Sequence, residues 1–254
     1  WIPAFFYKWG SGANGLAINA ISIQPLSAYS TVAAANTAGY ALHRAFYDGG
    51  AVQSGVFVDK YLASNNSGVA SSVKNGIPLS SAVRGSLSSS AFANLNGAPA
   101  NAYYGAIVAA KTRGANFFCN SRFIFAALAM LSYAHAQDSM NKTYCAWYDA
   151  INNFPKGCNN NAIGDAQDAA ILYVSDGNGT YPCGLTGSAN LFARTTHNGQ
   201  NCGIADLNGL LWEVTPGITS DGANIYLLKT TAQMKAVTSG NTLATDLWGA
   251  TGLA

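Results

Sequence analysis

The sequence predicts an α+β fold, in which two helices stand among small twisted antiparallel sheets and long loops. Apolar residues recur at helical spacing within residues 101–114 and 120–137. Aromatic or alternating stretches at residues 1–9 and 54–66 are typical of strands. After residue 140, Asn, Gly and Asp dominate long stretches of the kind that forms loops. Helices between β-hairpins and long polar loops favour the α+β class.

The first predicted helix covers residues 101–114. Tyr103, Ile107 and Ala110 follow one another at i, i+4 and i+7, so they share one face. Gly114 suits the position just after a helix, where a left-handed backbone is common.

The second predicted helix covers residues 120–137, with Asn120 or Ser121 as its N-cap. It is apolar nearly all round, so we expect it to be deeply buried. Its best-defined apolar face carries three residues, namely Ile124, Leu128 and Leu131.

Strands are expected on both sides of the helices. Residues 1–9 predict a strand with Pro3 near its start, as an edge strand permits. Residues 10–38 have weak periodicity, and residues 70–101 are rich in Ser, Gly and Asn, which indicates a loop. We therefore expect an N-terminal strand and irregular assembly segment at 1–38 and one compact domain at 39–254. The other expected strands are 39–50, 54–66, 209–214 and 224–229.

Composition excludes some classes of partner. Of the 254 residues, 49% are apolar and only 9% are charged, whereas charged residues make up about 25% of typical domains. The net charge is +2 without a basic cluster, so we expect no nucleic-acid partner. The longest apolar run, residues 123–131, is too short to cross a bilayer, so we expect no membrane insertion.

The cysteines and histidines form no recognisable site. The five cysteines include no CxxC pair, and we favour free thiols, although one or two disulfides remain open. His43, His135 and His197 lack the spacing of a metal-binding pair, so we expect structural roles for them.

Residues 203–214, "GIADLNGLLWEV", resemble the "GLYDMxGNVWEW" signature of the formylglycine-generating enzyme (sulfatase-modifying factor) family. Weaker resemblances occur in the same order along the chain, at "FVDKYLASN" (57–65), "AYYGAIVAAKTRG" (102–114), "SRFIFAALAMLSYA" (121–134) and "NFPKG" (153–157). Only the segment 198–214 is highly specific. The resemblance implies a C-type-lectin-like fold.

The resemblance also implies a calcium site in this loop. The carboxylates of Asp206 and Glu213 and the carbonyls of Gly209 and Leu211 would bind the ion, which prefers several oxygen ligands. In the alternative, Asp206 and Glu213 cap turns. In both interpretations Trp212 is a structural residue that fills the core.

The catalytic residues of the resembling family are missing. Its oxidases use a redox-active cysteine pair after the "WEW" element, but no cysteine follows Cys202, and position 214 is Val. We therefore expect a protein that is not an enzyme. A metal-dependent oxidase of the formylglycine-generating type remains as a second alternative.

The stretches "WIPAFFYK", "HRAFYDGG…FVDKY" and "FPKGCNNN" together resemble bacteriophage structural proteins that carry this fold. This resemblance implies a virion component, such as a tail fibre, head fibre or decoration module. We expect a lectin-like domain that attaches to a glycan or protein of the host surface. The first alternative is a decoration or assembly protein without receptor binding. The partners would be other virion subunits, including further copies of the chain, for example in a trimer.

The expected binding surface lies in the loops of residues 152–206 and in the aromatic residues just before them. Aromatic side chains with polar tips suit such surfaces, although the aromatic pair at 147–148 could equally pack the loop. The candidate residues are Trp147, Tyr148, Asn159, Asn160, Asn161, Tyr181 and His197.

Overall fold

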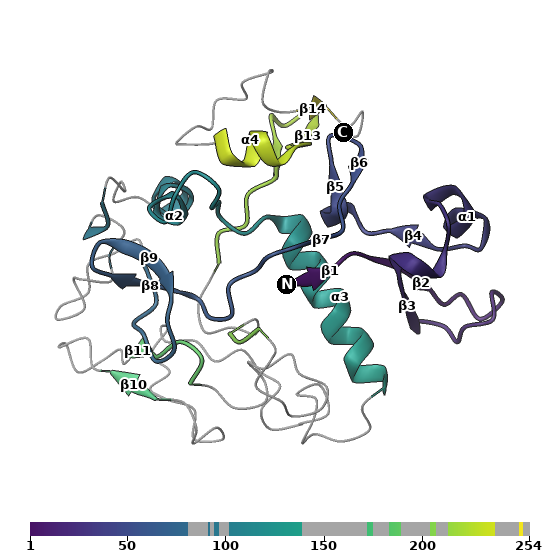
Figure 1. Cartoon of the computed structure of the whole chain (residues 1–254), viewed down its shortest axis with the longest axis horizontal. Helices are drawn as coiled ribbons and strands as arrows, with labels where there is room; N and C mark the ends of the chain where they lie inside the picture. Colours follow the sequence, from purple (N-terminus) through teal and green to yellow (C-terminus); the bar gives the residue numbers. More distant parts are fainter. Residues whose placement is uncertain are drawn as a thin grey trace.

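The computed structural model confirms the α+β class (Figure 1). It describes residues 1–80, 91, 94–96, 102–138, 172–174, 183–188, 204–206, 213–236 and 249–250. Within these residues four α-helices accompany antiparallel sheets of two or three strands. No helix in the described ranges is long and apolar enough to span a membrane.

The N-terminal strand prediction holds with one interruption at Ala4. The strand β1 (Ile2–Pro3) pairs with β7 (Gly55–Val56), and Ala4 then donates its N–H to the carbonyl of Ser54. The strand β2 (Phe5–Trp9) continues as the centre of a three-stranded sheet. Pro3 therefore lies in a two-residue strand, where the lost backbone donor costs little.

Residues 10–38 contain more regular structure than expected. They form β3 (Ile21–Pro25), which pairs with β2, then the 3₁₀ turn Leu26–Ala28 and the helix α1 (Val32–Thr37). The Thr31 hydroxyl caps this helix by accepting the N–H of Ala34 at 3.0 Å.

The strands expected at 39–50 and 54–66 are broken into short pieces, so that part of the prediction was wrong. His43 caps a 3₁₀ turn at Arg44–Phe46, which separates β4 (Ala41–Leu42) from β5 (Tyr47–Asp48). Residues 57–62 are irregular and divide β7 from β8 (Ala63–Asn66). The strand β6 (Ala51–Val52) pairs with β5.

A tight turn after residue 66 closes a hairpin. The strand β8 pairs with β9 (Val69–Ser72) through the two-residue turn Ser67–Gly68, whose φ angles of 54° and 86° suit a primed hairpin turn. Part of the stretch expected to be a loop at 70–101 is therefore a strand.

Both predicted helices are present. The helix α2 (Ala102–Lys111) buries Ile107 and ends three residues before Gly114, which donates its N–H to the carbonyl of Lys111. The helix therefore stops earlier than predicted.

The helix α3 (Arg122–Asp138) runs through the middle of Figure 1. Its N-cap is Ser121, whose hydroxyl accepts the N–H of Ile124 at 3.1 Å. Ile124 and Leu128 are buried as predicted. The prediction that this helix is deeply buried was wrong for one of its faces, since the side chains of Ala126 and Ala129 are exposed.

The main core joins the N-terminal sheet to α3 across the expected boundary at residue 38. The Phe5 and Phe46 rings meet edge to face with centroids 5.2 Å apart, and Phe6 packs against Tyr29 in the same way. The buried members of this cluster are Ala4, Phe5, Phe6, Ala35, Leu42, Phe46 and Ala127.

The C-terminal elements pack beside α2. The expected strand at 224–229 is present as β13 (Ile225–Leu227), between β12 (Ile218–Ser220) and β14 (Gly249–Ala250). Residues 213–214 of the strand expected at 209–214 are not in a strand, and its other residues lie outside the described ranges. Leu228, which follows β13, and Met234, which belongs to α4 (Thr231–Ala236), are buried and pack against Ile107. The remaining pair of strands is β10 (Tyr173–Val174) and β11 (Cys183–Gly184).

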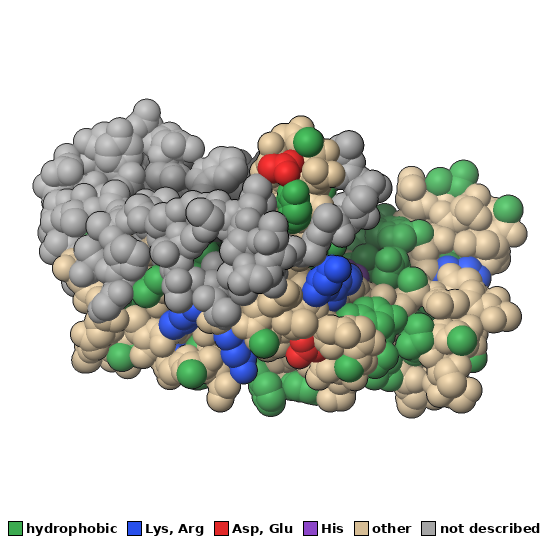
Figure 2. Space-filling model, turned by 90° about the horizontal axis from the view of Figure 1, so that it is seen from above, with side chains coloured by type: hydrophobic (Ala, Val, Ile, Leu, Met, Phe, Trp, Pro, Cys, Tyr) green, Lys and Arg blue, Asp and Glu red, His purple; other side chains and the backbone are tan. Residues whose placement is uncertain are grey.

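Arg44 connects the C-terminal segment to the N-terminal half. Its guanidinium donates to the carbonyls of Tyr47, Leu228 and Lys229 and lies 5.1 Å from the Phe123 ring centroid. In the face of the molecule that Figure 2 shows, the described charged side chains lie singly and are separated by apolar and neutral polar atoms.

Candidate functional site

Asp206 lies in the protein interior, 1% exposed, with a φ of 65°. Aspartate tolerates this left-handed backbone better than most residues. Both carboxylate oxygens lie 2.8 Å from the Gly187 nitrogen and accept its N–H, and Oδ2 also accepts the N–H of Leu62 at 3.3 Å. Ala205 donates its N–H to the carbonyl of Lys60 at 2.7 Å. Residues 204–206 are thus held between two other segments of the chain.

The turn that contains Gly187 is attached to a third segment through the fully buried Thr186. The Thr186 hydroxyl donates to the carbonyl of Val73 and accepts the N–H of Gly76 at 3.0 Å. The Thr186 carbonyl accepts the N–H of Asn75 at 2.7 Å. At Gly187 a Cβ would lie 2.3 Å from the Tyr61 ring, so only glycine fits there.

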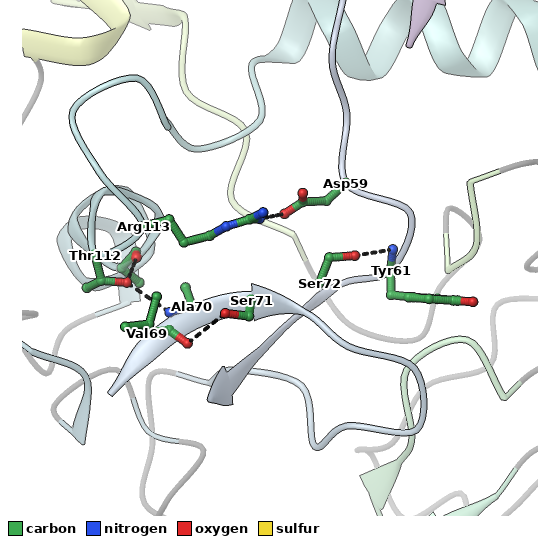
Figure 3. A network of polar contacts seen from close by, with 9 residues as sticks. Asp59, Tyr61, Val69, Ala70, Ser71, Ser72, Thr112 and Arg113 are labelled. Atoms are coloured by element: carbon green, nitrogen blue, oxygen red, sulfur yellow. Dashed lines mark hydrogen bonds and ion pairs between the residues drawn. The ribbon is translucent and has the colours of Figure 1, made fainter. Parts of the chain in front are cut away.

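The segment that donates the Leu62 N–H is also held in place (Figure 3). Tyr61 donates its N–H to the Ser72 hydroxyl at 3.0 Å, and Asp59 pairs with Arg113 beyond the end of α2. Asp206 therefore accepts hydrogen bonds from backbone groups whose positions other contacts determine.

Glu213 is the second carboxylate of this region. Burial, with a contribution from the charge of Asp206, raises the pKa of Glu213 to about 7. Burial also raises the pKa of Asp206 to about 6, although the N–H groups of Gly187 and Leu62 act in the opposite direction. The two groups thus repel each other when both are ionised, in a region that solvates charge poorly.

Cys119 lies near Glu213 as a free thiol, as expected for this cysteine. Its Sγ donates to the carbonyl of Val214 at 3.1 Å. Burial, with a contribution from the charge of Glu213, raises the pKa of Cys119 to about 12, so the sulfur stays protonated at neutral pH.

The donor set of this region fits a hard cation. No hydrogen bond to the Glu213 carboxylate is formed by the described residues. Asp206 Oδ1 accepts one N–H and keeps a second lone pair for a cation, whereas Oδ2 already accepts two N–H groups. A cation between the two carboxylates would remove their repulsion, and oxygen ligands of this kind suit calcium. Among the residues that the structure describes, no three His, Cys, Asp or Glu side chains gather to hold a metal.

Other predicted site residues lie outside the described residues. Of the predicted calcium ligands, Asp206 and Glu213 are described and interact electrostatically. The residues outside the described ranges are Gly209, Leu211, Trp212 and the seven binding candidates Trp147, Tyr148, Asn159, Asn160, Asn161, Tyr181 and His197.

His43 has the structural role that the sequence predicts. Its Nδ1 accepts the N–H of Ala45 at 3.2 Å, and its ring lies among those of Phe5, Tyr7 and Phe46. Burial lowers the pKa of His43 to about 4, so the ring is neutral at physiological pH.

The hydrogen-bond partners of Asp206 were not predicted from the sequence. Leu62 and Gly187 donate backbone N–H groups to the carboxylate, and the Thr186 hydroxyl holds the turn that contains Gly187. Only the "GLTG" stretch at 184–187, with threonine beside a turn glycine, carries a signal of this in the sequence.

No protein-family model matches the chain, and no curated protein matches it.

Proposed function

We propose that this chain is a non-catalytic structural protein of a bacteriophage virion that displays a C-type-lectin-like domain for attachment to the host surface. The proposal rests on the sequence resemblance and on one structural observation, the electrostatic interaction of the buried Asp206 with the partly buried Glu213. Both residues belong to the stretch that resembles the calcium-binding signature, and each has a pKa above its usual range.

In this proposal calcium stabilises the binding loops. The ion would be held by Asp206 and Glu213, with carbonyls of Gly209 and Leu211, and would supply positive charge between a buried and a partly buried carboxylate. Asp206 also accepts hydrogen bonds from the turn at 185–187 and from Leu62. Binding of the ion to Asp206 would therefore also stabilise the turn at 185–187 and the segment that contains Leu62.

Attachment is tested by binding of the purified, fluorescently labelled chain to intact bacterial cells, first with calcium and then with a chelator. We expect saturable binding that the chelator abolishes and that added calcium restores. Glu213→Gln keeps the side-chain shape and removes the charge, so this variant should bind cells weakly even with calcium. No saturable binding to a broad set of bacterial hosts would contradict attachment.

The second candidate is a decoration or assembly protein that binds other virion subunits, and exposed apolar side chains at the β2–β3 hairpin favour it. Trp9 is 45% exposed and Ile18 is 70% exposed. Association of the purified chain into trimers or larger oligomers, lost in Ile18→Ser, would support this candidate. A monomer at all concentrations, measured by light scattering, would count against it.

A further inference from the structure

An exposed pair of aromatic rings lies where β1 meets β7. Phe57 is 83% exposed and Trp1 is 54% exposed. Their ring centroids are 4.8 Å apart and their planes are inclined by 58°. Two large apolar rings in contact with each other and with solvent form a surface that can bind a ligand.

The position of the Trp1 ring is determined by the backbone beneath it. Ile2 pairs with Val56 and Pro3 pairs with Gly55 in the β1–β7 ladder. A Cβ on Gly55 would lie 2.6 Å from the Trp1 ring and 2.3 Å from the carbonyl oxygen of Ile2. The glycine thus allows the indole to lie directly on the strand, so the ring is held in place before any ligand arrives.

A second group of exposed and charged side chains lies close to this pair along the chain. Asp59 follows Phe57 by two residues, so their Cα atoms are at most about 7 Å apart. Asp59 forms an ion pair with Arg113 (Figure 3). The Arg113 guanidinium lies 4.3 Å from the Phe117 ring centroid. The side chain of Asp59 is 43% exposed, and Phe117 is 40% exposed. We call these five residues, Trp1, Phe57, Asp59, Arg113 and Phe117, the aromatic strip.

We propose that the aromatic strip binds the pyranose rings of a neutral oligosaccharide. This rests on the attachment function proposed above, for which it names a ligand class and a site outside the loops of residues 152–206. The C–H face of a pyranose is apolar and matches an exposed aromatic face, whereas its hydroxyls need donors and acceptors at the edge. Arg113 supplies donors and Asp59 supplies acceptors. Because these two charges neutralise each other, the strip favours an uncharged sugar.

The size of the strip argues for a small ligand over a second protein. Fully buried aromatic side chains cover about 150–250 Å² each, so the exposed parts of these three rings offer on the order of 400 Å². A stable protein interface buries about 800 Å² on each partner. The strip is about half of that, which suits a few sugar rings.

Titration calorimetry with soluble hexasaccharides of glucose, mannose and N-acetylglucosamine tests the proposal on the full chain. We expect saturable binding of at least one of them. Phe57→Ala should weaken it about tenfold, and Phe57→Trp should restore it to within about threefold of the unchanged protein, since the stacking face returns. Ile18→Ala is the matched control, because Ile18 is also an exposed apolar residue but lies in another hairpin.

Arg113→Met gives a second test that does not depend on the Phe57 ring. It keeps an apolar contact to Phe117 but removes the donors, and we expect about a tenfold loss of hexasaccharide affinity. The thermal unfolding midpoint of each variant shows whether it is folded.

Binding of none of the three sugars, or binding that Phe57→Ala and Ile18→Ala change equally, would overturn the proposal. Calcium-dependent binding to cells that persists in Phe57→Ala, together with no sugar binding, would overturn only the aromatic strip. Absence of both cell binding and sugar binding would overturn the attachment function as well.

Discussion

The packing around β2 and the packing around Asp206 hold this chain together in different ways. Around β2, the rings of Phe5, Phe6 and Phe46 interlock with small residues and exclude water. Around Asp206, one buried carboxylate accepts backbone N–H groups from two distant segments. The packing around β2 is stabilised by the burial of apolar surface, whereas the region around Asp206 is stabilised by hydrogen bonds between buried polar groups. The first should therefore be most sensitive to lost volume and the second to a lost acceptor.

The largest effect is expected at the apolar core. Phe46→Ala should lower the free energy of unfolding by about 3–5 kcal/mol, because the fully buried ring leaves a cavity among close-packed neighbours. Urea unfolding followed by circular dichroism measures the change. The matched control is Phe57→Ala, whose exposed ring should change stability by less than about 0.5 kcal/mol. Equal losses in both variants would contradict the assignment of the core.

At Asp206 the comparison separates the acceptor from the charge. Asp206→Ala should cost about 2–4 kcal/mol, since the N–H groups of Gly187 and Leu62 lose their buried acceptor. Asp206→Asn keeps a carbonyl oxygen, tolerates the positive φ and removes the repulsion with Glu213, so its cost should be smaller. If Asn were as damaging as Ala in urea unfolding without calcium, the hydrogen bonds would not be the reason.

Acid should weaken the β2 region through His43. Its pKa falls from 6.5 to about 4 on folding, so the unfolded state binds more protons between these pH values. Above about pH 6.5, His43 does not lower the free energy of unfolding. As the pH falls from 6.5 towards 4, protonation of the unfolded state lowers the free energy of unfolding, by about 2 kcal/mol at pH 5. His43→Asn retains an acceptor for the Ala45 N–H and should lose correspondingly less stability between pH 7 and pH 5.

His43→Asn is compared with wild type because the carboxyl groups of Asp206 and Glu213 change stability with pH in the direction opposite to His43. The raised pKa values of Asp206 and Glu213 make stability decrease as the pH rises from about 4 to 7, in both proteins alike. Urea unfolding at several pH values yields the difference between the two slopes. Parallel slopes for His43→Asn and wild type would contradict the neutral buried imidazole.

The smallest effect is expected where Arg44 connects the two halves of the chain. Arg44→Ala removes three hydrogen bonds to carbonyls and the contact with Phe123, and we expect a loss of about 1–2 kcal/mol. Hydrogen exchange should accelerate in residues 225–236 more than in β2. Uniform acceleration in both regions would show that Arg44 contributes to global stability without a local role.

The sequence predicted the apolar parts of this fold better than the polar ones. Both central helices followed from periodic apolar residues, and the strand expected at residues 1–9 followed from a run of aromatic residues. These elements together with the polar loops predicted the α+β class. The strand at 39–50 was wrong because His43 caps a turn through its side chain, which leaves no periodic trace. The Asp206–Glu213 pair was predicted from a resemblance. Its partners Leu62 and Gly187 were not predictable, since backbone N–H groups are present at every residue except proline.

The central claim is that Asp206 and Glu213 form a cation site, and thermal unfolding with and without millimolar calcium tests it most directly. Binding to the folded state should raise the unfolding midpoint of wild type by about 5–10 °C at calcium well above its Kd, and magnesium should have a smaller effect. Glu213→Gln should unfold at a higher temperature than wild type without calcium, because the repulsion is gone, and should not respond to the ion. A wild-type midpoint that ignores calcium, or an equal response in Glu213→Gln, would contradict the claim.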